Sequence, residues 1–124
     1  MEQKNAVIKS TELTIADHGL LTGWLHLDYE DCSQGFGGYV LYLPKTFDHH
    51  KLYSLAGHWI FRVLEIAGVE EWSKLPGRTI RVRAEYDCVH AIGHIIKDEW
   101  FNPREDFAAI IEAAKKTDDP DPED

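Results

Sequence analysis

Leu21-Thr22-Gly23-Trp24-Leu25-His26-Leu27-Asp28-Tyr29 is the stretch whose pattern does most to decide the fold. Apolar and polar side chains alternate along it, as in a β-strand that buries one face. The expected buried face consists of Leu21, Leu25, Leu27 and Tyr29. The opposite face carries Thr22, Trp24, His26 and Asp28. Trp24 on this polar side implies either that a second layer covers the face or that the ring is exposed for a partner.

Two further strands are expected on either side of this one in the chain. Residues 6–16 alternate in the same way, with Val7, Leu13 and Ile15 on one face, and residues 39–43 form a short run that ends at Pro44. Three strands joined by short connections favour an antiparallel meander.

The centre of the chain has a helical period instead. Apolar residues recur every three or four positions over residues 50–67, between an N-cap candidate at Asp48 and a stop at Gly68. Trp59 and Phe61 are expected to be core aromatics within this helix.

The remaining chain predicts two strands and a second helix. Residues 79–86 and 88–96 alternate, and Asn102 with Pro103 forms a cap for a helix that extends to residue 116. The order βββ-α-ββ-α indicates an α+β fold with an antiparallel sheet of about five strands, a long helix packed on one face and a short C-terminal helix. We expect one domain over residues 1–116 and a disordered acidic tail over residues 117–124.

The charge of the chain limits its partners. The formal net charge is −9 at pH 7, which disfavours direct contact with nucleic-acid phosphates and favours a protein with a basic surface. The sequence predicts no membrane span and no signal peptide, so we expect a cytoplasmic location. A homodimer and a self-assembling module are left open.

The segment Gln34-Gly35-Phe36-Gly37-Gly38-Tyr39 is expected to be a loop that contacts another molecule. Glycine permits positive φ and close approach of another surface, and Phe36 would lie at an exposed tip. The alternative is that the Phe36 ring turns inward and plugs the end of the core. The predicted partner-binding residues are Trp24, His26, Asp28, Gln34, Gly35, Phe36, Gly37, Gly38 and Tyr39.

Enzymatic chemistry finds less support. A metal-dependent hydrolase or nuclease is the alternative function, and it would use His26, Asp28, His90 and His94. Residues four apart on a regular strand are about 13 Å apart, so His90 and His94 cannot share one ion unless Gly93 marks a bulge. We therefore predict no catalytic residue and no metal or other cofactor. Arg81, Arg83 and Glu85 share a strand face and are expected to form a charge ladder with neighbouring strands.

Three segments resemble a known family. They are residues 23–29, residues 34–39 and residues 92–101, and the Gln-Gly-Phe-Gly-Gly-Tyr element is the most specific of them. Over residues 11–101 the chain is similar to a family of small uncharacterised proteins of tailed phages and prophages. The resemblance implies expression in the cytoplasm of a bacterial host and action as an inhibitor that binds a host defence protein. It assigns no catalytic residue.

Overall fold

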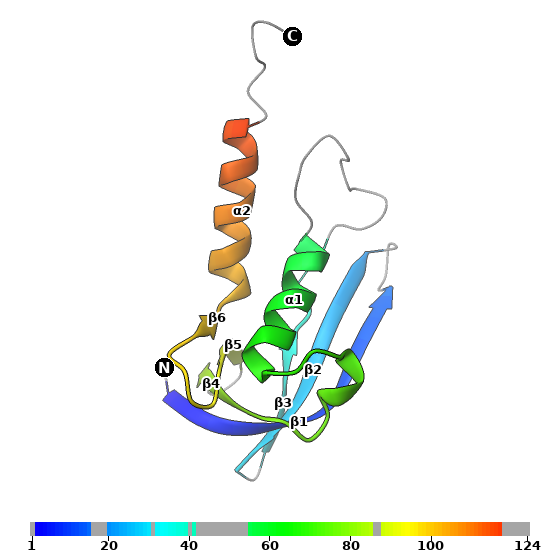
Figure 1. Cartoon of the computed structure of the whole chain (residues 1–124), viewed down its shortest axis with the longest axis vertical. Helices are drawn as coiled ribbons and strands as arrows, with labels where there is room; N and C mark the ends of the chain where they lie inside the picture. The colour runs from blue at the N-terminus through cyan, green and yellow to red at the C-terminus, as the bar shows by residue number, and fades with distance from the viewer. Residues whose placement is uncertain are drawn as a thin grey trace, which may run out of the picture.

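The protein is described by a computed structural model over residues 2–15, 20–30, 32–39, 41, 55–85 and 88–117, with side chains given as far as residue 113. These residues form one antiparallel sheet in the order β3-β2-β1-β4-β5-β6, with two helices (Figure 1). The strands are β1 (Glu2–Ile15), β2 (Leu21–Tyr29), β3 (Cys32–Gly37), β4 (Thr79–Glu85), β5 (Cys88–Gly93) and β6 (Trp100–Phe101). The helices are α1 (Leu55–Ala67) and α2 (Pro103–Thr117), and Trp72–Lys74 form a short 3₁₀ turn. The predicted α+β class with an antiparallel sheet is confirmed, with six strands in place of about five.

Several predicted boundaries fall beyond the described chain. The Asp48 cap, the first turn of the central helix and most of the strand predicted over residues 39–43 are outside the described residues. So is the acidic tail after Thr117. Leu41 N donates a hydrogen bond to Leu21 O at 3.1 Å, so pairing with β2 continues past the end of β3.

A β-bulge in β1 overturns one predicted face. The pairing of β1 with β2 shifts register between Ile8 and Ser10, so the extra residue reverses which side chains point inward beyond it. Ala6 and Ile8 are buried in the core, while Val7 is 42% exposed. The prediction that Val7 shares a face with Leu13 is therefore wrong, because a strict period of two fails at a bulge.

Helix α1 packs against one face of the sheet through its apolar stripe. The buried residues of the helix are Leu55, Ala56, Trp59, Val63, Ile66 and Ala67. A Cβ on Gly23 would lie 2.6 Å from the Trp59 ring, so glycine in β2 leaves the space that this ring fills. Trp59 is a core aromatic as predicted. Phe61 is 65% exposed, so its assignment to the core is wrong: it lies on the outer side of the helix.

The sheet curves so that β3 approaches β5, which is not its hydrogen-bonded neighbour. Phe36 of β3 and Phe101 of β6 meet across this gap with ring centroids 6.1 Å apart. Figure 1 shows α1 lying against the sheet and α2 extending away from it. The concave side of the sheet thus holds α1 and the core, and the other side faces away from the helices.

Strand β5 ends earlier than predicted, at Gly93, because the chain turns at His94. The Nδ1 atom of His94 accepts hydrogen bonds from Ile96 N and Lys97 N, both at 3.0 Å. Arg81 donates to His94 O and Lys97 O, each at 2.7 Å. These bonds hold residues 94–99 as a loop that returns the chain to β6.

Helix α2 begins with the predicted cap. Asn102 Oδ1 accepts a hydrogen bond from Glu105 N at 3.3 Å, and Pro103 occupies the first helical position. His58 Nε2 of α1 lies 2.7 Å from Asp106 Oδ2, which ties the two helices together. Within the described part of the chain, neither helix is long and apolar enough to cross a membrane.

Candidate functional site

The predicted binding residues lie on the adjacent strands β2 and β3 at one edge of the sheet, or directly after β3. Trp24, His26 and Asp28 are on β2, and they face away from α1, as their alternation predicts. The glycine-rich segment is mostly strand rather than loop: Trp24 pairs with Gly37 and His26 with Gly35. The structure therefore brings most of the predicted residues together, but the prediction of a free loop is wrong.

The glycines of this segment make room for a side chain of the same molecule. Ideal Cβ atoms on Gly35 and Gly38 would lie 2.7 Å and 2.4 Å from atoms of the Trp24 ring. The indole therefore lies against the backbone of this segment at positions where any side chain would displace it. Gly37 has φ +140°, and a Cβ there would lie 2.0 Å from Gly23 O. The loop was expected to let a partner approach closely, but the space serves Trp24 and the β2 backbone.

Phe36 is buried, so the prediction of an exposed tip is wrong. Its side chain is 0% exposed and stacks on Trp59 with ring centroids 6.4 Å apart. Alternation along β3 explains this placement, because Gly35 and Gly37 lie on the face that is turned away from α1 and Phe36 lies on the face that α1 covers. The inward alternative is the one observed, and Tyr39 adds an edge contact at 6.3 Å.

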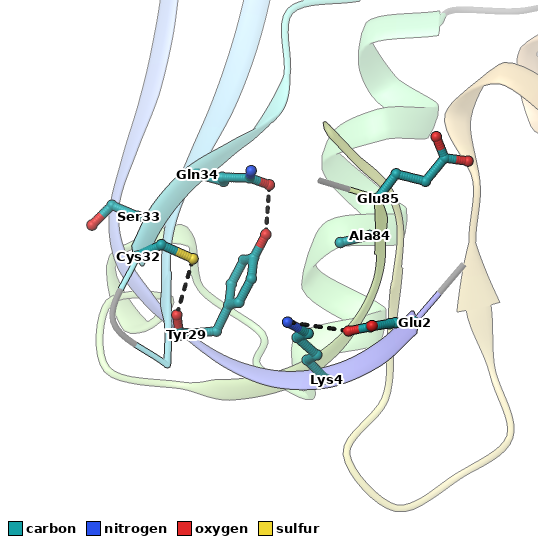
Figure 2. A pocket seen from close by; sticks show the side chains of 8 residues that line it. All are labelled: Glu2, Lys4, Tyr29, Cys32, Ser33, Gln34, Ala84 and Glu85. Atoms are coloured by element: carbon teal, nitrogen blue, oxygen red, sulfur yellow. Dashed lines mark hydrogen bonds and ion pairs between the residues drawn. The ribbon is translucent and has the colours of Figure 1, made fainter. Parts of the chain in front are cut away.

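A pocket lies at the end of the sheet where β3 faces β4, and we call it the Tyr29 pocket (Figure 2). It has a volume of about 660 Å³, within the range of sites for small ligands or side chains. Its lining consists of Glu2, Lys4, Tyr29, Cys32, Ser33, Gln34, Ala84 and Glu85. In Figure 2, Tyr29, Cys32 and Gln34 lie on one side, and Ala84 and Glu85 lie on the strand across from them.

Hydrogen bonds order the inner wall of the Tyr29 pocket. The hydroxyl of Tyr29 donates to Gln34 Oε1 at 2.5 Å, and Cys32 Sγ donates to Tyr29 O at 3.3 Å. Burial raises the pKa of the Tyr29 phenol above its ordinary value, with a further contribution from the Cys32 thiol. Tyr29 therefore stays neutral, and its hydroxyl is held by Gln34 at the inner wall of the pocket.

The rim of the Tyr29 pocket has more carboxylates than cations among the described residues. Lys4 Nζ lies 3.2 Å from Glu2 Oε2 and 3.1 Å from Glu30 Oε2. The hydrogen bonds to Glu30 and Glu2 raise the pKa of the Lys4 ammonium. Glu85, at the opposite rim, lies 3.8 Å from His90 Nε2 and is 59% exposed. With Lys4 shared between two carboxylates, the rim keeps a negative balance.

A second, shallower hollow of about 430 Å³ lies on the other face of the same strands. It adjoins the bulge in β1 and includes His26, Asp28 and Gly35 in its lining. Ser33 Oγ donates to Asp28 Oδ1 at 2.5 Å, and His26 Nε2 lies 3.6 Å from Glu12 Oε1. Ser33 and Gln34 line both hollows, so the start of β3 separates them.

The residues proposed for a metal centre are not brought together. His26 and Asp28 are on β2 and His90 is on β5, with β1 and β4 between them in the sheet. His94 caps a loop instead, through the two hydrogen bonds already described. Among the described residues, no three histidine, cysteine or carboxylate side chains lie where they could hold one ion. Cys32 and Cys88 are free and exposed.

Sequence reasoning missed the members of the Tyr29 pocket outside the glycine-rich segment. Glu2 and Lys4 belong to the first residues of β1, which was predicted to start at residue 6. Alternating charged and polar residues from Glu2 to Asn5 are a signal that could have extended that strand. Nothing in the pattern could have placed Glu85 opposite Tyr29, because that proximity depends on the curvature of the sheet.

Comparison of the chain with protein families, curated proteins and solved structures found no match.

One buried and one half-buried tyrosine predict a loss of stability above pH 10. Burial raises the pKa of Tyr39 as well as that of Tyr29. Above about pH 10 the unfolded chain releases these protons and the folded chain keeps them, so the free energy of unfolding falls by up to about 1.4 kcal/mol per pH unit for each group. Denaturation of the wild type and of the Tyr29→Phe, Tyr39→Phe variant at pH 8 and pH 10.5 measures the effect. We expect the variant to lose less stability than the wild type between the two pH values. Equal losses would contradict the assignment of the effect to Tyr29 and Tyr39.

Proposed function

We propose that this protein acts by binding another protein, and that the Tyr29 pocket takes up basic side chains of that partner. The negative rim of a preformed pocket is the observation that carries the proposal. Glu2 and Glu85 line the opening, and Lys4, the one cation among the lining residues, is already shared between Glu2 and Glu30. An additional ammonium or guanidinium group would gain attraction there without displacing a protein cation.

The inside of the pocket suits the long stem of such a side chain. Lysine and arginine carry apolar methylene groups that pack on rings while the charged head stays in a polar environment. Tyr29 and Ala84 offer the apolar surface, and the Tyr29 hydroxyl and Gln34 amide offer polar contacts at the inner wall. Lys4 Nζ lies 5.6 Å from the centroid of the Tyr29 ring, so a cation is already accommodated beside this ring.

A nucleic-acid-binding protein of the host is the class of partner that fits best. Such proteins carry basic grooves for phosphates, and a chain with a net charge of −9 would be drawn to them. The resemblance to small phage and prophage proteins supports the same class, because proteins of that kind often inhibit host defence. Binding at a basic groove would exclude nucleic acid and so inhibit the partner.

Affinity capture from bacterial lysate with two matched baits tests the proposal. The first bait carries Glu2→Lys and Glu85→Lys at the rim of the pocket. The control bait carries Glu70→Lys and Glu112→Lys, which make the same change in net charge at positions outside the pocket lining. We expect wild type and the control to recover the same basic protein and the rim variant to lose it by tenfold or more.

Competition with nucleic acid then tests the mode of action. Adding short duplex DNA or RNA to the captured complex should release this protein from its partner, because both would occupy one basic groove. Recovery of the partner by the rim variant at the wild-type level would reject the Tyr29 pocket as the binding site. A partner that binds nucleic acid and this protein at the same time would reject inhibition by exclusion.

A further inference from the structure

The face of the sheet that points away from α1 carries two arginines on one half and two carboxylates on the other. We call it the open face, and its defining residues are Val7, Glu12, Asp28, Arg81, Arg83 and Trp100. Strand β1 runs between the halves, because it pairs with β2 on one side and β4 on the other. None of these residues belongs to the buried core, and Val7 near the centre is 42% exposed.

The half formed by β4, β5 and β6 carries two arginines, with the carboxylate of Asp98 beside them, where Asp98 Oδ1 accepts a hydrogen bond from Trp100 Nε1 at 3.2 Å; we call it the basic half. The guanidinium carbons of Arg81 and Arg83 lie 4.9 Å and 3.9 Å from the ring centroid of Trp100. That indole lies against β5, where a Cβ on Gly93 would come within 2.7 Å of it. The predicted charge ladder with Glu85 is wrong, because Glu85 contacts His90 and both arginines stack on Trp100 instead. Within the described chain, no carboxylate lies within ion-pair distance of Arg81 or Arg83.

The half formed by β2 and the second part of β1 carries two carboxylates, Glu12 and Asp28, and one lysine, Lys9, which is exposed at the bulge and lines the hollow that includes Asp28; we call it the acidic half. Asp28 accepts a hydrogen bond from Ser33, and among the described residues it has no cationic partner. Glu12 lies beside β2, where His26 Nε2 is 3.6 Å from its carboxylate. Trp24 marks the outer edge of this half, as Trp100 marks the outer edge of the basic half.

We propose that the open face binds a second copy of this chain, with the basic half of each copy against the acidic half of the other. The strand register supports a two-fold arrangement. Asp28 lies one strand from β1 opposite Val7, and Arg83 lies one strand away on the other side opposite Gln3. Asn5 lies midway between Gln3 and Val7 on β1. A two-fold axis that lies in the plane of contact and crosses β1 near Asn5 places Asp28 of each copy opposite Arg83 of the other.

A second copy fits this face better than a partner of one charge sign. A uniformly basic surface would meet Arg81 and Arg83 unfavourably, and a uniformly acidic surface would meet Asp28 and Glu12 in the same way. An isologous pair forms each favourable contact twice and requires no other molecule. The proposal does not depend on the Tyr29 pocket, which lies on the face of α1.

Mixing two charge-reversal variants tests this arrangement by analytical ultracentrifugation. In Asp28→Lys, a homodimer would set the introduced lysine against Arg83, and in Arg83→Glu it would set the introduced glutamate against Asp28. In the mixed dimer, one contact pairs the introduced lysine with the introduced glutamate, and the other is the wild-type pair. We expect a dimer for the wild type, dissociation constants at least tenfold weaker for each variant alone, and recovery of the dimer in the equimolar mixture.

A second pair of variants guards against loss of fold, since Arg83→Glu also removes a contact to Trp100. Val7→Arg places a bulky cation within the proposed contact, two residues along β1 from the two-fold axis, and Phe61→Arg adds the same charge on the exposed side of α1. Both side chains are well exposed, at 42% and 65%, so both variants should fold. We expect Val7→Arg to be monomeric and Phe61→Arg to dimerise like the wild type. A monomeric wild type at millimolar concentration, or a mixture that stays monomeric while both variants are folded, would overturn the proposal.

Discussion

Replacement of Phe36 by alanine is expected to lower the free energy of unfolding by about 3–5 kcal/mol, the range for truncation of a fully buried phenylalanine. The ring is 0% exposed and contacts Trp59, Tyr39 and Phe101 from three directions. These neighbours belong to different parts of the fold, so they cannot collapse together into the cavity that alanine leaves. Urea denaturation measures the change, and the melting temperature should fall by more than about 10 °C.

Phe61→Ala is the matched control for this prediction. It removes the same atoms from a side chain that is 65% exposed, so we expect a change within about 0.5 kcal/mol. Equal losses in the two variants would mean that Phe36 is not the core residue that its contacts indicate. A small loss of free energy of unfolding for Phe36→Ala would indicate that the ring is exposed, as its glycine neighbours suggested.

Replacement of Gly37 by alanine should destabilise the fold by about 3 kcal/mol, because two costs combine there. The backbone φ of +140° is itself strained for any residue with a side chain, and such strain costs on the order of 1–3 kcal/mol. In addition, a Cβ would lie 2.0 Å from the carbonyl oxygen of Gly23. That atom belongs to the backbone of β2, so it cannot rotate away, and β3 must separate from β2. Urea denaturation with a check of the slope measures this loss.

Gly77→Ala separates the two contributions. Gly77 also has a positive φ, of +91°, but nothing lies within 4 Å of the position that its Cβ would take. We expect this control to lose only about 1 kcal/mol, from the backbone conformation alone. Suppose that Gly37→Ala loses no more free energy of unfolding than Gly77→Ala. The contact with Gly23 is then relieved by movement of the backbone, and the pairing of β2 with β3 is less rigid than its geometry indicates.

The local sequence pattern was sufficient to predict those elements whose tertiary surroundings agree with the pattern. The alternation in residues 21–29 correctly predicted which side of β2 holds Leu25 and Leu27 and which holds Trp24 and His26. The cap at Asn102 also follows from short-range chemistry. These predictions succeed because the alternation of a strand and the capping of a helix depend on residues that are close together in the chain.

The glycine-rich segment shows where local pattern failed. Three glycines around one aromatic ring fit a loop as well as they fit a strand that receives a neighbouring indole. Only the partner strand distinguishes the two, since Trp24 lies on β2 and fills the space over Gly35 and Gly38. The same limit applies to Val7, whose face depends on a bulge in the pairing with β2.

The sequence by itself determined an acidic α+β chain with an antiparallel sheet, the inner and outer faces of β2 and β4, and the start of α2. Each depends on periodicity, charge or a cap, which neighbouring residues decide among themselves. Tertiary structure alone decided that Phe36 points inward, that Glu85 faces Tyr29 across a pocket and that Arg83 stacks on Trp100. Those relations join residues far apart in the chain, and they arise from the curvature of the sheet and its packing on α1, which no local pattern encodes.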